Sequence, residues 1–175
     1  RLNLKLDVKK LVQSALFVAI GILLPMVFHS IQGAGAIFLP MHIPVLICGL
    51  YCGYKYGALC GLITPLLSSL LTQMPPIYPT GVAMTLELMT YGTISGLLHK
   101  KYNVFLSLIL SMLAGRAVSG IANTILFGLA GKPYGLETFL TASFVKALPG
   151  IVIQLIFIPI IVTLLEKRNF LREED

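Results

Sequence analysis

Charged residues are scarce in this chain of 175 residues. They make up 11% of the sequence, whereas a soluble globular domain carries about 25%. Hydrophobic residues account for 57%, so the polar residues are too few to cover a water-soluble surface. The composition therefore excludes a soluble globular protein and predicts an integral membrane protein. At this length we expect one domain, over residues 1–175.

The sequence also lacks the common motifs of enzymes and metal proteins. It has no nucleotide-binding loop, no Gly-x-Ser-x-Gly elbow and no His-Glu-x-x-His pair. Its three cysteines, Cys48, Cys52 and Cys60, lie in apolar segments without a nearby histidine or carboxylate. We interpret them as buried thiols that pack as small hydrophobic groups. We therefore predict a protein that is not an enzyme and that binds no cofactor or metal.

Long apolar runs dominate what remains. They are continuous rather than alternating, which disfavours a β-barrel and predicts membrane-spanning helices. Six runs can be counted, over residues 8–28, 41–54, 56–72, 80–98, 104–130 and 136–165. The predicted fold is an all-α integral membrane protein, a compact bundle of six transmembrane helices. The first run is long enough to span, so we expect no cleavable signal peptide.

The basic residues lie mostly at the ends of these runs. Most of the 13 lysines and arginines fall in the two tails and in the junctions after the second and fourth runs. With six spans these four regions share one side, and an excess of basic residues marks the cytoplasmic side. We expect both termini to be cytoplasmic in a cell membrane. The net charge of +6 then indicates contacts with anionic lipid rather than with nucleic acid.

Three ionisable residues, Glu87, Arg116 and Lys146, interrupt the predicted spans. A charge near the bilayer centre costs at least about 2.5–3.5 kcal/mol, so such residues usually face a polar interior. One negative and two positive charges would leave a net positive pocket, which suits a small monoanionic ligand. An arginine can hold a carboxylate through two parallel hydrogen bonds. The alternative is that Glu87 and Arg116 pair with each other and lock two helices together.

Two neutral polar residues extend this candidate pocket. Tyr91 follows Glu87 by four residues, so both lie on one helix face. Asn123 lies on the same helical stripe as Arg116, about two turns away. We expect both to contact hydroxyl or amide groups of a ligand.

The outer segments supply further candidates. Phe38 ends a glycine-containing loop with an apolar tip, and Gln73 and Tyr78 flank a proline-rich break. These residues are expected to close over a ligand, or else to rest on the bundle as ordinary loops. His42 begins the second run, where it would either contact the ligand or cap a helix.

Ala15 and Ala19 form a flat pair on one face of the first run, one turn apart. A surface of small residues invites a close-packed helix. The pattern alone leaves open whether that helix belongs to this chain or to a partner.

Taken with the six short helices and the cytoplasmic termini, the Ala15-xxx-Ala19 pair and the stretch from Phe38 to Pro44 resemble a known family. It is the substrate-binding S component of an energy-coupling factor (ECF) vitamin transporter. The resemblance implies a vitamin-binding membrane protein of a prokaryote that associates with a transmembrane coupling subunit and two cytoplasmic ATPase subunits. It also implies that Ala15 and Ala19 dock to the coupling subunit and that the pocket lies near the outer surface.

The S components share a fold while binding different vitamins, so the substrate follows from the pocket. A net positive pocket favours a carboxylate, and pantothenate is the first candidate, with folate, biotin, niacin and lipoate as others. The absence of tryptophan argues against a large flat ring system. A cationic ligand such as thiamine would use Glu87 instead. The alternative function is a stand-alone secondary transporter or channel for a small organic anion.

Overall fold

The computed structural model describes residues 7–28, 30, 40–73, 76–129, 131 and 135–173. All regular structure in these residues is helical, which confirms the predicted all-α class. The elements are α1 (Val8–Phe28), α3 (His42–Cys52), α4 (Tyr54–Thr72), η1 (Ile77–Gly81), α5 (Val82–Leu98), α6 (Val104–Leu129), α7 (Leu136–Leu140), η2 (Thr141–Val145) and α8 (Leu148–Glu173). The two η segments are short and π-helical.

The predicted count of six helices is wrong for the described residues, which contain seven α-helices. The difference lies in the last apolar run, which holds the short helix α7, the π-helical turn η2 and then α8. Pro149 stands in the first turn of α8. A proline lacks the N–H that a continuing helix needs, and it disfavours helical backbone in the residue before it. The run therefore restarts there as a new helix.

Three helices are long and apolar enough to cross a membrane: α1, α6 and the part of α8 from Leu148 to Arg168. The helices α3 and α5 are apolar but shorter. The remaining long helix, α4, carries Pro65 in its interior. These lengths agree with a helical membrane bundle.

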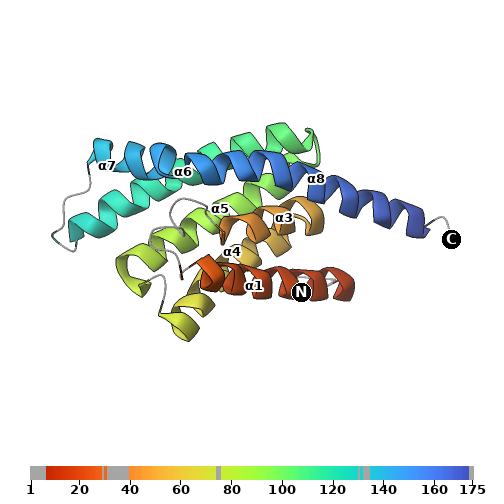
Figure 1. Ribbon diagram of the computed structural model, residues 1–175, viewed down its shortest axis with the longest axis horizontal. Coiled ribbons are helices and arrows are strands. Elements are labelled where there is room, and N and C mark those ends of the chain that lie inside the picture. The colour runs from red at the N-terminus through yellow and green to blue at the C-terminus, as the bar shows by residue number, and fades with distance from the viewer. Residues whose placement is uncertain are drawn as a thin grey trace, which may run out of the picture.

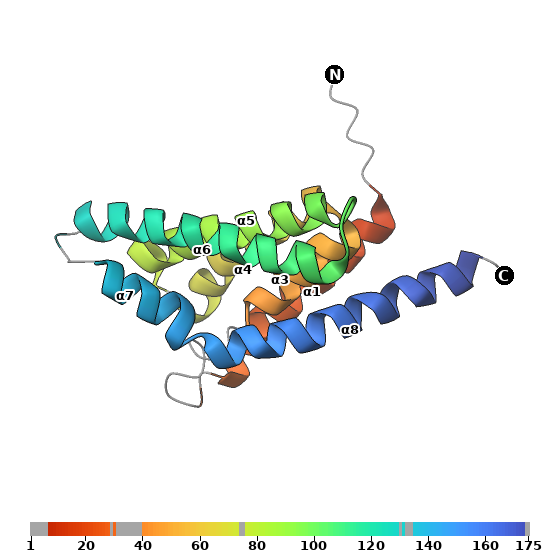
Figure 2. The ribbon, with the colours of Figure 1, turned by 90° about the horizontal axis from the view of Figure 1, so that it is seen from above.

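The helices α3, α4 and α5 form the centre of the bundle (Figure 1). On one side α1 packs against α3 and α4, and on the other side α6 packs against α5. The last helix, α8, packs against α3 and α6, and its C-terminal part extends past the other helices in both views (Figure 2). The centre therefore lies under α1 on one side and under α6 and α8 on the other.

Glycines let the central helices touch through their backbones. A Cβ atom added at Gly92 of α5 would collide with the backbone of Gly57 in α4, and one at Gly61 would collide with the backbone of Leu88. Small residues spaced four apart allow this close approach in lipid. The predicted intramolecular role of these glycines is confirmed. Because backbones in contact cannot slide past each other, α5 is held at one height beside α4.

Candidate functional site

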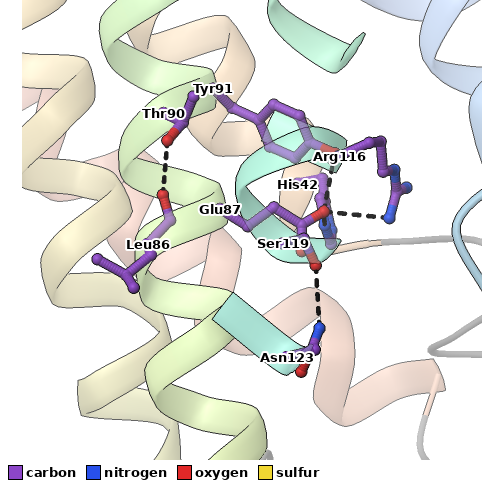
Figure 3. Close-up of polar contacts among 8 residues, drawn as sticks. All are labelled: His42, Leu86, Glu87, Thr90, Tyr91, Arg116, Ser119 and Asn123. Carbon is purple, nitrogen blue, oxygen red and sulfur yellow. Dashed lines mark hydrogen bonds and ion pairs between the residues drawn. The ribbon is translucent and has the colours of Figure 1, made fainter. Parts of the chain in front are cut away.

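A buried carboxylate, Glu87 of α5, is the centre of a polar cluster inside the bundle (Figure 3). Its Oε1 atom lies 2.8 Å from the Tyr91 hydroxyl, 3.2 Å from Nε2 of His42 and 3.1 Å from Nη1 of Arg116. The donors come from α5, α3 and α6, and all four residues are at most 6% exposed. Protein donors from three helices thus replace the water that would otherwise solvate this carboxylate.

Local sequence explains how two of these groups meet. Tyr91 follows Glu87 by one helical turn, and its ring packs against Gly115 of α6, where an added Cβ atom would collide with ring carbons. The ring centroid of His42 lies 5.3 Å from that of Tyr91, at a tilt of 58°. The tyrosine ring therefore fills the space between α5 and α6 and directs its hydroxyl to Glu87.

Arg116 uses only part of its guanidinium group in this cluster. Nη1 bonds to Glu87, whereas Nε and Nη2 are buried and have no hydrogen-bond acceptor among the described residues. Those two nitrogens form one edge of the guanidinium fork, the edge that matches the two oxygens of a carboxylate. In Figure 3 the guanidinium lies beyond Glu87 and points away from α5. The cluster thus leaves a complete two-donor edge unused.

A cavity of about 130 Å³ adjoins Arg116 between α6, η2 and α8. It is lined by Ile109, Met112, Leu113, Arg116, Phe144, Ile151 and Leu155. Its exposed wall is apolar, so Arg116 contributes its hydrocarbon stem while the two free nitrogens stay covered. The structure therefore places an apolar compartment beside a covered pair of cationic donors.

The other predicted pocket residues lie outside this cluster. Asn123 donates from Nδ2 to the Ser119 hydroxyl at 3.2 Å, farther along α6 (Figure 3). The Tyr78 side chain is half-exposed and donates to the backbone oxygen of Leu126 at 3.2 Å. Gln73 is exposed and ends α4 in the left-handed region, at φ 59°.

Two further candidates have different positions. Lys146 is exposed between η2 and α8, two residues after Phe144 of the cavity wall. Phe38 lies outside the described residues. Among the charged residues predicted to share a pocket, the structure thus joins Glu87 and Arg116 and leaves Lys146 at the surface.

Sequence reasoning missed two features of the site. The contact between His42 and Glu87 joins residues 45 positions apart, and no local spacing indicates it. Gln154 of α8 is 1% exposed, and its Nε2 atom has no acceptor among the described residues. A signal for Gln154 was present, since it is an isolated polar residue in a long apolar run.

The predicted docking residues lie on the outer face of α1. Ala15 and Ala19 are exposed, and Leu16 and Leu23 beside them are each 59% exposed. The opposite face of α1 packs inward, with Gly21 against Thr64 of α4. The alanine pair is therefore available to a partner rather than used in the packing that the structure describes.

Apolar helices of spanning length around a buried ion pair define the class of helical membrane proteins with a polar interior. The family model for the ECF transporter, substrate-specific component, matches residues 9–162. The chain belongs to this family, which confirms the resemblance seen in the sequence. It is accordingly a multi-pass membrane protein and a transporter subunit. A comparison with curated proteins and one with solved structures each found no significant match.

Proposed function

We propose that this chain binds a small vitamin with a carboxylate group, pantothenate being the first candidate, at a site that opens to the cell exterior. The vitamin then passes to the cytoplasm through a transmembrane coupling subunit driven by two ATPase subunits. Both termini are cytoplasmic in this proposal, following the distribution of basic residues.

The observation that carries the proposal is the unused edge of Arg116. Buried donors without acceptors are rare and costly, so each one calls for an explanation. A purely structural partner for Glu87 would be expected to use its donors more fully than Arg116 does. A ligand carboxylate would satisfy both free nitrogens with two parallel charge-assisted hydrogen bonds.

The apolar cavity supports the same proposal. It can receive the hydrocarbon body of a ligand whose carboxylate reaches Arg116. The free nitrogens are covered, so binding requires side chains of the wall to move. The π-helical turn η2, which carries Phe144 of that wall, is a suitable place for this movement, since π-helical turns often occur at functional sites.

The decisive test is the thermal stability of the purified protein in detergent against a panel of vitamins. A ligand that binds only the native state stabilises it by about 2.7 kcal/mol at 100 times its dissociation constant. We expect a raised midpoint with one of pantothenate, biotin, niacin, lipoate and folate, and none with thiamine. A shift with thiamine alone would contradict an Arg116-centred anion site and would favour Glu87 as the ligand contact.

The docking half of the proposal rests on the exposed alanines of α1. Small side chains allow a partner helix to approach closely, so large ones should keep it away. In the double variant Ala15→Trp with Ala19→Trp we expect unchanged vitamin binding but loss of uptake in cells that hold the whole transporter. Normal uptake by this variant would remove the docking assignment.

A further inference from the structure

Gln154 is a buried amide that the cluster around Glu87 does not explain. It is 1% exposed within the apolar helix α8, and its Nε2 atom has no acceptor among the described residues. Leaving such a group unsatisfied costs about 1–3 kcal/mol, whereas an apolar side chain of the same shape would avoid that cost. A leucine or methionine would therefore serve better if the position only had to be filled.

The position of Gln154 along α8 places it beside the cavity. Ile151 and Leu155 line that cavity, and Gln154 lies three residues after the first and one before the second, so the three share one side of the helix. The helix α8 packs against α3 and α6, which carry His42 and Arg116. The amide is thus buried on the side of α8 that faces the proposed ligand site.

We propose that Gln154 is a specificity-determining residue of this site and donates a hydrogen bond to a neutral oxygen of the ligand. The inference rests on the proposed function, in which the free edge of Arg116 holds the carboxylate. Arg116 and Gln154 offer chemically different donors: a cationic pair for an anion, and a neutral amide for a carbonyl or hydroxyl oxygen. The apolar wall between α6 and α8 accommodates the hydrocarbon part.

The ligand class follows from these three features. It is a monocarboxylate with an apolar body and one further neutral oxygen acceptor. Pantothenate carries an amide carbonyl and biotin a ureido carbonyl, so both belong to the class. Lipoate has a carboxylate and an apolar body but no second oxygen acceptor. It is therefore a matched probe for the contribution of Gln154.

The test compares Gln154→Met, which keeps the length of the side chain and removes its amide, with the wild-type protein. Affinities for pantothenate, biotin and lipoate are measured by calorimetry on the full chain in detergent. We expect the variant to lose about tenfold in affinity for the best-bound carbonyl-bearing vitamin and to keep its affinity for lipoate. Its unliganded midpoint should be equal to or higher than that of the wild type, because the unpaired amide is gone.

Ser107→Ala is the matched control. The Ser107 hydroxyl is also buried and has no partner among the described residues, but it lies nine residues before Arg116, about 13 Å along α6. Its removal should leave all three affinities unchanged. A parallel loss in both variants would overturn the assignment of Gln154, since a general effect of buried polar groups would explain it.

The remaining outcomes separate this inference from the proposed function. If the wild type binds a carbonyl-bearing vitamin and Gln154→Met binds it equally well, Gln154 has no role in specificity and the proposed function stands. Binding of lipoate in preference to both carbonyl-bearing vitamins also overturns only the inference. If no carboxylate-bearing vitamin binds the wild type, both fail. A lowered unliganded midpoint with unchanged affinity would make Gln154 a packing residue.

Discussion

Two histidine–glutamate pairs join helices in this protein, and their surroundings differ. His42 and Glu87 lie 3.2 Å apart inside the bundle, with side chains 4% and 7% exposed. His99 and Glu166 lie 2.7 Å apart where the end of α5 meets α8, with side chains 19% and 46% exposed. The shorter contact is the more exposed one. A surface pair contributes about 0–1 kcal/mol, whereas breaking a buried pair costs about 3–5 kcal/mol. Burial, rather than distance, ranks the two.

The neighbours of the two pairs differ as well. Glu87 also accepts hydrogen bonds from Tyr91 and Arg116, and Arg116 keeps two donors in reserve. The outer pair is a single contact that fastens α8 to the end of α5. The inner pair belongs to a network that a ligand can join, and the outer pair is a simple clasp. The variants below test that distinction, from the largest expected effect to the smallest.

Glu87→Gln should have the largest effect on stability. It leaves the Arg116 charge buried without a counter-charge, so we expect a loss of about 3–5 kcal/mol in the free energy of unfolding. Chemical denaturation in detergent, with and without ligand, measures it. A loss below about 1 kcal/mol would show that the buried network is energetically equivalent to a surface pair.

Arg116→Lys should affect binding more than stability. A lysine keeps the positive charge beside Glu87 but cannot offer the planar two-donor edge to a carboxylate. We expect affinity for the carboxylate-bearing vitamin to fall by about 10–100-fold, since hydrogen bonds to charged groups contribute about 1.5–3 kcal/mol each. Calorimetric titration of the two proteins gives the ratio. Equal affinities would show that the guanidinium edge does not hold the ligand.

Gly115→Ala tests how the network is positioned. The new methyl group would collide with the Tyr91 ring, which must move away from Glu87 or push α6 outwards. Overpacking of this kind costs about 1–3 kcal/mol. The control is Gly128→Ala on the same helix, where an added Cβ atom has no neighbour within 4 Å and should stabilise the helix by about 0.5–1 kcal/mol. Thermal midpoints that fall equally in both variants would contradict the Tyr91 contact.

Glu166→Gln should have the smallest effect. The outer pair is partly solvated, so we expect at most about 1 kcal/mol of lost stability and no change in ligand affinity. The loss should shrink further at high salt, because exposed charges are screened. Denaturation at two salt concentrations measures this. A loss comparable to that of Glu87→Gln would break the comparison between the two pairs.

Much of the architecture was accessible from the sequence. The first apolar run, 8–28, coincides with α1, and the run at 104–130 ends one residue beyond α6. Glu87 and Arg116 stood out as intramembrane charges, and the spacing of Glu87 and Tyr91 placed them on one helix face. Each of these predictions depends on hydropathy or on residues within one helical turn, and such properties are local to the chain.

The tertiary structure alone decided which of these groups meet. It joined His42 to a carboxylate 45 residues away, left one edge of Arg116 without an acceptor among the described residues, buried Gln154 and left Lys146 at the surface. These outcomes depend on the rotation and height of each helix relative to its neighbours. Backbone contacts such as those at Gly92 and Gly61 set that register, and it is a property of packed pairs of helices rather than of any single segment.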